Sequence, residues 1–237
     1  MKALILNSGL GSRMGVLTSE HPKCMTEVSA TETILSRQLK QLADAGIREV
    51  VMTTGYYDSV LVSYCNSLEL PVHITYVKNP IYDQTNYIYS IYCAREELQD
   101  DLILMHGDLV FEDAVLDRVL ASPGSCMTVS STLPLPEKDF KAQVKDGFVL
   151  RVGIHFFEEA MAAQPLYFLR REDWLRWLDR IGEFCQRGET GVYAENALNT
   201  LEGAAGIAAL DVKDLLCAEI DNPQDLEAVT RRLEKLK

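Results

Sequence analysis

Several features that would point to a particular class of protein are missing from this sequence. It has no apolar run near the ~20 residues that a membrane-spanning helix needs, and no signal-peptide cleavage pattern follows its N-terminus. Its six cysteines include no closely spaced pair, which argues against a zinc site and a disulfide framework. We therefore expect a cytoplasmic protein with no membrane partner, in which the cysteines are buried free thiols.

Positive charge is also scarce. The chain has 23 lysine and arginine residues against 35 aspartate and glutamate residues, which gives a formal net charge of -12. A surface this acidic repels nucleic acid, so no nucleic-acid partner is expected, and a polyanionic ligand must meet a local cluster of cations. The sequence leaves the oligomeric state open, with a homo-oligomer among the alternatives.

The first half of the chain alternates short apolar runs with helical patterns. Buried strands are expected at 3–6, 50–53, 72–76 and 102–105, and helices at 33–45, 57–68 and 86–98. Continuous apolar runs are typical of strands buried on both faces, and their alternation with helices predicts a parallel sheet covered by helices. A chain of 237 residues that is 47% hydrophobic can bury one such core.

The second half gives fewer signals. Asp146-Gly147 separates two short apolar stretches, and Asp-Gly is a strong signal for a β-hairpin. A charged amphipathic helix is expected at 171–187, and a final helix is expected to begin where Asn222 can act as its cap. No repeat or linker interrupts the chain, so we expect a single domain over 1–237.

A glycine-rich segment directly follows the first expected strand and contains Gly9, Gly11 and Gly15. Ligands bind at the carboxyl ends of strands in open α/β sheets, and glycines let backbone N–H groups approach phosphates closely. No Gly-Lys-Ser/Thr closes the segment, so it is not a Walker A loop, and Met14 stands where a dinucleotide fingerprint needs its third glycine. Taken alone, the glycines are equally consistent with a plain turn.

Two cations make a phosphate ligand the better interpretation. Arg13 lies inside the glycine segment, and Pro22-Lys23 ends an irregular stretch of about ten residues. Long irregular loops in compact domains usually have a function. A solvated surface charge explains either cation alone, whereas both on one loop favour neutralisation of a triphosphate on an otherwise acidic protein.

The residues of this segment resemble the signature of the sugar-1-phosphate nucleotidylyltransferase superfamily. That resemblance rests on Leu6-Asn7-Ser8-Gly9-Leu10-Gly11-Ser12-Arg13-Met14, Pro22-Lys23 and Glu27. Later segments are similar to the phosphocholine cytidylyltransferase branch: Ala45-Gly46-Ile47, Gly55-Tyr56, Asn79-Pro80-Ile81-Tyr82, Thr85-Asn86 with Ser90, Gly107-Asp108 and Glu219-Ile220-Asp221. The resemblance implies a Rossmann-like three-layer α/β/α fold with a mostly parallel mixed central sheet. Residues 1–110 would form its nucleotide-binding half and 111–237 its acceptor-binding half.

The resemblance also implies a division of roles. Asp108 and Asp221 would hold Mg²⁺, which prefers oxygen ligands. An acceptor oxygen would attack the α-phosphorus in line, with Lys23 and Arg13 as the catalytic cations that neutralise developing charge. The implied nucleotide contacts are Leu6, Asn7, Ser8, Gly9, Gly11, Ser12, Arg13, Thr85 and Asn86. The plainer alternatives are a turn residue for Asp108 and a helix-start acid for Asp221, and Glu219 is either a supporting group or an exposed one.

Acceptor recognition is less defined. A quaternary ammonium would need an aromatic box and a carboxylate, for which the candidates are Tyr82, Tyr87, Tyr193 and Glu195, with Asp83 and Trp174 as weaker ones. For each aromatic residue, and for Trp174 above all, core packing is the alternative. The expected acceptors are phosphocholine, aminoethylphosphonate or a phosphoglutamine-like compound.

We therefore expect a CTP-dependent cytidylyltransferase that releases pyrophosphate. One alternative is a sugar-1-phosphate nucleotidylyltransferase that uses UTP, GTP or dTTP, and another is a non-catalytic nucleotide-sensing domain. Asn7-Ser8 stands where the family often has two alanines, and Tyr87 follows Asn86 where the choline branch tends to have a second asparagine. These departures leave the nucleobase and the acceptor open.

Overall fold

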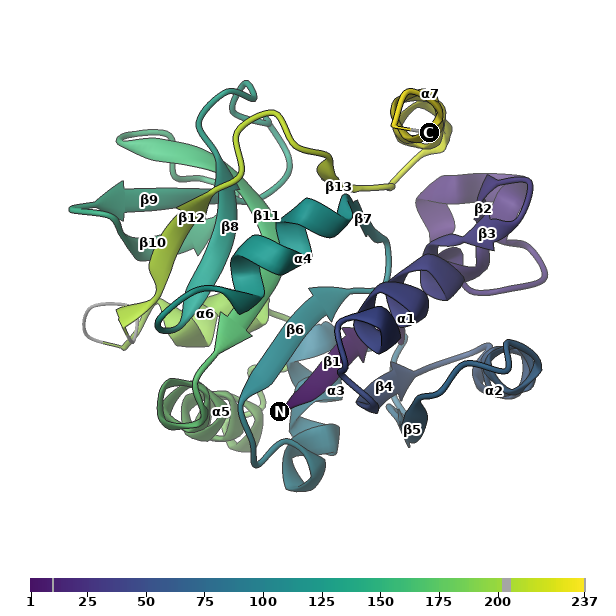
Figure 1. Ribbon diagram of the computed structural model, residues 1–237. Coiled ribbons are helices and arrows are strands. Elements are labelled where there is room, and N and C mark those ends of the chain that lie inside the picture. Colours follow the sequence, from purple (N-terminus) through teal and green to yellow (C-terminus); the bar gives the residue numbers. More distant parts are fainter. Residues whose placement is uncertain (10, 202–205, 237) are drawn as a thin grey trace.

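The computed structural model describes residues 1–9, 11–201 and 206–236. Within them, nine strands form one sheet in the order β5-β4-β1-β6-β11-β8-β12-β10-β9 (Figure 1). The strands are β1 (Lys2–Leu6), β4 (Glu49–Thr54), β5 (His73–Lys78), β6 (Leu102–His106), β8 (Cys126–Ser130), β9 (Lys141–Lys145), β10 (Phe148–Gly153), β11 (Ala160–Leu169) and β12 (Ala208–Asp211). Two small sheets pair β2 (Glu27–Ser29) with β3 (Glu32–Thr33), and β7 (Leu109–Phe111) with β13 (Cys217–Glu219).

The first four strands of this order are mutually parallel, as the sequence predicted. Ala3, Leu4 and Ile5 at the centre of β1 are completely buried, because strands lie on both sides of β1 and helices cover both faces. The expected helices also form, with shorter bounds for the third. They are α1 (Ile34–Asp44), α2 (Asp58–Ser67) and α3 (Tyr87–Ala94), the last followed by the 3-10 turn η3 (Arg95–Glu97).

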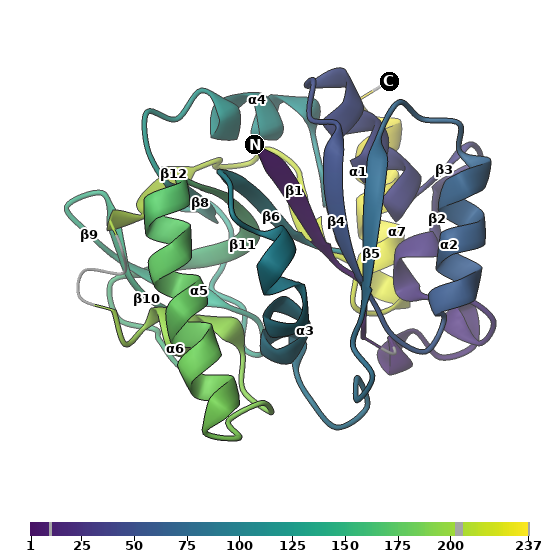
Figure 2. The ribbon, with the colours of Figure 1, turned by 90° about the horizontal axis from the view of Figure 1, so that it is seen from below.

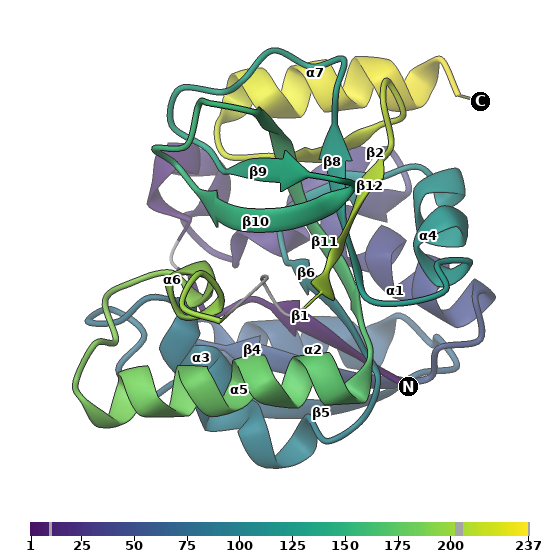
Figure 3. The same ribbon diagram turned by 90° about the vertical axis from the view of Figure 1, so that its left-hand side faces the viewer.

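The remaining strands join the four parallel strands through an antiparallel pairing. β11 pairs antiparallel with β6 on one side and with β8 on the other. β9 pairs with both β10 and β11, so this end of the sheet curls back on itself (Figure 3). The predicted hairpin is confirmed, since Asp146 and Gly147 both have positive φ angles, 52° and 82°, as a type I′ turn requires.

Helices cover the two faces of the sheet, which confirms the expected three-layer α/β/α fold (Figure 2). On one face, α3 packs with α5 (Arg171–Gln186) and α6 (Ala194–Leu198), and on the other α1 and α2 pack with α4 (Asp113–Leu120). Trp174 is fully buried in the first of these layers, so its role is core packing and not acceptor binding. In the described part of the chain, no helix has the length and apolar character that a membrane crossing requires.

The last segment of the chain returns to the strand that follows β6. β13 pairs antiparallel with β7, which sets Glu219 opposite Leu109. The final helix, α7 (Pro223–Glu234), then begins at the expected cap, where the Asn222 side chain accepts hydrogen bonds from the N–H groups of Gln224 and Asp225. This pairing brings the C-terminal acidic residues beside the loop that carries Asp108.

Candidate active site

The carboxyl ends of β1, β4 and β6 meet in a space that only glycine permits. A Cβ atom on Gly107 would lie 1.7 Å from the Oδ1 atom of Asn7, and one on Gly55 would lie 2.3 Å from the carbonyl oxygen of Ser8. Two non-bonded heavy atoms in a protein do not approach each other this closely. The glycines after β4 and β6 therefore let both strand ends close against the residues that follow β1.

The loop after β1 has a fixed shape. Gly11 has a φ of +63°, and its backbone lies so near Lys23 that a Cβ would meet the Cβ of that lysine at 3.0 Å. The Thr18 hydroxyl donates to the carbonyl oxygen of Gly11 at 3.1 Å, which closes the 3-10 turn η1 (Ser12–Thr18). The Tyr57 hydroxyl donates to the carbonyl oxygen of Ser19 at 2.8 Å and anchors the loop to α2.

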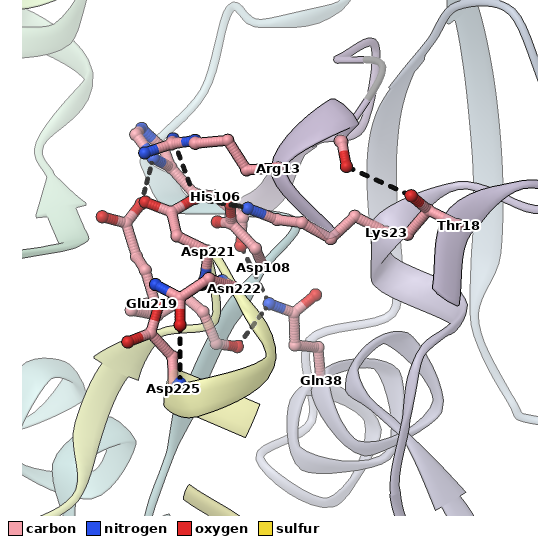
Figure 4. Close-up of polar contacts among 12 residues, drawn as sticks. Arg13, Thr18, Lys23, Gln38, His106, Asp108, Glu219, Asp221, Asn222 and Asp225 are labelled. Carbon is pink, nitrogen blue, oxygen red and sulfur yellow. Dashed lines mark hydrogen bonds and ion pairs between the residues drawn. The ribbon is translucent and has the colours of Figure 1, made fainter. Parts of the chain in front are cut away.

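A cluster of opposite charges lies where the loop meets the ends of β6 and β13 (Figure 4). The Lys23 ammonium lies 2.5 Å from Oδ2 of Asp108 and 2.6 Å from Oδ1 of Asp221, and the Arg13 guanidinium lies 2.9 Å from the same oxygen of Asp221. Burial opposes the charge on Lys23, but the two carboxylates outweigh it and raise the pKa of Lys23. Burial likewise works against ionised Asp108, and Lys23 outweighs it and lowers the pKa of Asp108. Both groups are therefore charged at neutral pH.

Two side chains outside this cluster hold its backbone in place. The Gln38 amide of α1 donates to the carbonyl oxygens of His106 at 2.9 Å and Leu109 at 2.8 Å, on either side of Asp108. The Asp225 carboxylate of α7 accepts the N–H of Asp221 at 2.9 Å, within the capping box of that helix. Asp108 and Asp221 are thus each fixed by a helix from outside the sheet.

His106 forms a second charged pair at this point. Its Nδ1 atom lies 2.7 Å from Oε1 of Glu219. Burial would lower the pKa of His106, but Glu219 and Asp108 outweigh it and raise that pKa to about 9. Glu219 is thus a supporting group of the cluster and not an exposed acid, and His106 was missed by the sequence reasoning although it directly precedes Gly107-Asp108.

The oxygen atoms of the cluster suit a divalent cation. Oδ1 of Asp108 is buried and has no hydrogen-bond partner in the part of the chain that the structure describes. Ligand atoms of His106, Asp108 and Glu219 all lie within 4.8 Å of one another, and Asp221 adjoins them through Lys23. Carboxylates with a free oxygen are the ligands that Mg²⁺ and similar ions prefer. The residues present therefore fit a divalent cation beside Asp108, whereas Asp221, the other predicted ligand, lies outside this group of ligand atoms and contacts Lys23.

Three pockets open side by side at Asp108. The first, about 290 Å³, is lined by Leu6, Asn7, Gly9, Gly11, Arg13, Lys23 and Asp221. The second, about 190 Å³, is lined by Ser8, Tyr82, Thr85 and Asn86, and the third, about 350 Å³, by Arg13, Tyr87, Tyr193, Glu219 and Asp221. Every described member of the predicted nucleotide set thus lines the first two pockets, whereas the side chain of Ser12 lies outside what the structure describes.

Hydrogen bonds connect the second pocket to the glycine loop. The Ser8 and Ser90 hydroxyls lie 2.6 Å apart, and the Asn79 amide donates to the Ser90 hydroxyl at 3.0 Å and to the Thr85 hydroxyl at 2.9 Å. The network explains why the Asn-Pro and Thr-Asn-x-x-Ser motifs accompany the glycine loop in the sequence. Tyr82 lines this second pocket with Ser8 and does not line the pocket of Glu195, so the structure does not gather the four predicted acceptor residues into one box.

Glu195 does not line the third pocket, but it accepts a hydrogen bond from Tyr87, which does. It is only 1% exposed, and its carboxylate accepts hydrogen bonds from the hydroxyls of Tyr87 and Tyr167. It lines a further pocket of about 360 Å³, which shares Phe140 and Tyr193 with the third pocket. Within residues 1–9, 11–201 and 206–236, no lysine or arginine forms an ion pair with Glu195. The Glu195 carboxylate is instead satisfied by these two hydroxyls and by the positive charge of His106, whose pKa it helps to raise.

Comparison with known families agrees with this arrangement. The sequence profile of the MobA-like NTP transferase domain matches residues 3–193. The chain belongs to this family. Among curated relatives, the MobA-like domain is 34% identical over 238 residues to the CMP-5'-(3-aminopropyl)phosphonate synthase of Streptomyces rubellomurinus, covering 95% of the chain but 37% of that protein. It is 32% identical over 160 residues to the CTP:phosphoglutamine cytidylyltransferase of Campylobacter jejuni, covering 64% of the chain and 62% of that protein.

The chain therefore spans less than two thirds of the length of these two relatives. Among solved structures, the domain resembles the CTP:phosphocholine cytidylyltransferase of Streptococcus pneumoniae with a TM-score of 0.79 at 18% identity, over 98% of both chains. It resembles the inositol-1-phosphate CTP transferase of T. maritima with a TM-score of 0.77 at 20% identity, over 100% of this chain and 96% of the other. At such identities the structural likeness establishes the nucleotidyltransferase fold.

Proposed function

We propose that this MobA-like domain is a cytidylyltransferase that joins CMP from CTP to a small phosphono- or phospho-acceptor carrying an amine, with release of pyrophosphate. The observation that carries the proposal is the position of Lys23, Asp108 and Asp221 at the junction of three pockets. A triphosphate, a nucleoside and an acceptor can each occupy one pocket and meet at this junction.

The residues would share the work as follows. Backbone N–H groups of the glycine loop and the exposed Arg13 guanidinium bind the β- and γ-phosphates, which leave as pyrophosphate. Lys23 neutralises charge on the α-phosphate in the transition state, for which its two carboxylate contacts hold it in place. Asp108 and Asp221 would hold Mg²⁺, which supplies charge neutralisation between the phosphate and the acceptor. The acceptor oxygen needs no protein base, because a phosphonate or phosphate is already an anion.

The acceptor class follows from the third pocket and from the curated relatives. Asp221 lines the third pocket and Glu195 lines the adjoining one, and the two pockets share Phe140 and Tyr193, so an acceptor that spans both can present its anion near Asp221 and an amine near Glu195. Two of these relatives are named as enzymes for an aminopropylphosphonate and for phosphoglutamine. We therefore favour an amino-phosphonate or a related amino-phosphate over a sugar phosphate.

A pyrophosphate-release screen tests the proposal. It crosses CTP, UTP, GTP, ATP and dTTP with 3-aminopropylphosphonate, 2-aminoethylphosphonate, phosphocholine, phosphoglutamine and glucose-1-phosphate, in the presence of Mg²⁺. We expect turnover with CTP and an amine-bearing acceptor. Turnover confined to glucose-1-phosphate would instead support a sugar nucleotidylyltransferase, and no turnover with any pair would argue for a nucleotide-sensing domain.

A further inference from the structure

A buried lysine lies at the edge of the third pocket and takes no part in the chemistry proposed above. Lys141 is the first residue of β9 and is 0% exposed. Its backbone is part of the sheet, in register with Gly153 of β10 and Ala162 of β11. The base of this side chain is therefore held by two neighbouring strands.

The Lys141 ammonium is satisfied almost entirely by backbone carbonyl groups. It donates to the carbonyl oxygens of Pro136, of Glu137 at 3.4 Å and of Asp139 at 3.0 Å. It also lies 4.2 Å from the centre of the Phe157 ring, which stabilises a cation through its π-face. Among the described residues, no carboxylate is within ion-pair distance of it. A buried ammonium without a carboxylate is expensive to maintain, and an apolar residue at this position would not carry that cost.

The three carbonyl groups belong to one loop, residues 131–140, which joins β8 to β9 (Figure 3). We call it the acceptor loop, because its last residues, Lys138, Asp139 and Phe140, line the third pocket together with Arg13 and Asp221. The loop has no helix or strand of its own. Its end is held by the contacts of the Lys141 ammonium and by the Phe140 carbonyl, which accepts the N–H of Ala163 at 3.0 Å.

We propose that Lys141 is a positioning residue for acceptor binding, which folds the acceptor loop back so that Lys138, Asp139 and Phe140 face the acceptor. The inference rests on the proposed function, since it assigns the third pocket to the acceptor. It adds a specific division of labour, in which the loop contributes to the acceptor and not to the nucleotide, because residues 136–141 do not line the first or second pocket.

The test replaces Lys141 with methionine, which keeps the length of the side chain and removes the charge. Lys145→Met is the matched control, because Lys145 lies on the same strand and is exposed. Phe157→Ala is a second variant, which weakens the environment of the ammonium from the exposed side and leaves the buried packing intact. Thermal melts establish that each variant folds.

Amide hydrogen exchange gives the first readout and needs no substrate. We expect Lys141→Met to speed exchange of the amides that are hydrogen-bonded at the two ends of this loop, those of Ser131, Leu133 and Ala163, by about tenfold or more, with β8 unchanged, because the loop loses several hydrogen bonds to a charged group. Phe157→Ala is expected to shift the same amides by less, and Lys145→Met to shift none of them. Unchanged exchange of these amides in folded Lys141→Met would overturn the inference, and should that variant not fold, unchanged exchange in Phe157→Ala would do the same.

Steady-state kinetics with CTP and 3-aminopropylphosphonate gives the second readout. We expect the KM for the phosphonate to rise about tenfold in Lys141→Met while the KM for CTP stays within about twofold of wild type. An equal rise in both KM values, or no rise in either, would contradict a role in acceptor binding. If the wild-type protein does not turn over this pair, the amine-bearing acceptor found by the screen replaces 3-aminopropylphosphonate. If no pair of the screen is turned over, the proposed function is at fault, and hydrogen exchange alone then decides the role of Lys141.

Discussion

Asp108 and Asp221 share a single ammonium, that of Lys23, although one acid lies near the middle of the chain and the other near its C-terminus. Asp108 follows the end of β6 and Asp221 follows the end of β13, and the pairing of β13 with β7 brings the two acids together. Because the glycine loop supplies the lysine, three segments must fold before the cluster exists. The cluster thus couples the fold of the domain to its proposed chemistry, and the groups that support it can be tested one at a time.

Gln38 supports the Asp108 side of the cluster. Gln38→Met nearly keeps the shape of the side chain, but it removes the amide that donates to the carbonyl oxygens of His106 and Leu109. Since buried acceptors left without a partner cost about 1–3 kcal/mol, we expect a loss of that size in urea unfolding, together with a lower kcat. Gln99→Met, at an exposed position, should stay within about 0.5 kcal/mol of wild type. A Gln38→Met variant of wild-type stability and activity would show that Gln38 does not hold this loop.

Gly107 is predicted to tolerate no side chain. The Cβ of Gly107→Ala would overlap Oδ1 of Asn7, so the glycine loop and the strand end must separate. We expect a destabilisation of about 1–3 kcal/mol and a raised KM for CTP. Gly124→Ala serves as the control, because its Cβ would meet no atom within 4 Å. Equal melting temperatures for the two variants would mean that the close approach to Asn7 is not needed.

The pairing of His106 with Glu219 predicts a dependence of stability on pH. The pKa of His106 is about 9 in the folded protein against 6.5 normally. Protonation of His106 therefore contributes stability that is fully present below pH 6.5 and is lost as the pH rises to about 9. Urea unfolding in EDTA should show this fall, and His106→Asn should remove most of it. A curve of the same shape for both proteins would place the titrating group elsewhere.

Glu195 is expected to select for an amine on the acceptor. Glu195→Gln removes the charge and keeps an acceptor oxygen for only one of the two tyrosine hydroxyls, because Tyr87 and Tyr167 donate to different carboxylate oxygens. We expect the KM for 3-aminopropylphosphonate to rise about tenfold or more, because a charge-assisted contact is lost. The KM for propylphosphonate, which has no amine, should change little. Equal changes for the two phosphonates would rule out recognition of the amine by Glu195.

Much of this arrangement could be predicted from the sequence, since its signals are local. Apolar runs and glycines identify the parallel strands and the loop after β1, and Asp146-Gly147 identifies the hairpin. β11 was not predicted, although it is the longest strand of the sheet. Its pairing with β6, β8 and β9 depends on contacts distant in sequence, and its residues are apolar on both faces without a turn signal at either end.

In the candidate site too, residues in local motifs could be predicted, and residues placed by contacts distant in sequence could not. Arg13, Lys23, Asp108 and Asp221 stand in motifs, and the structure brings these four together. Gln38 and Lys141 stand in no motif, because their partners are backbone carbonyl groups whose position depends on the folded chain. A glutamine on a helix or a lysine at the start of a strand reads as an ordinary surface residue until the burial of its side chain is known.

The most direct test of the proposed chemistry compares wild type with Lys23→Ala by ³¹P NMR, using CTP, 3-aminopropylphosphonate and Mg²⁺. Wild type should form pyrophosphate and a CMP-linked phosphonate in equal amounts. Lys23→Ala should remain folded and lose about 10²–10³ in kcat, the usual effect of removing one group that stabilises transition-state charge. Full activity of folded Lys23→Ala, or pyrophosphate formed without the CMP-linked product, would contradict the account.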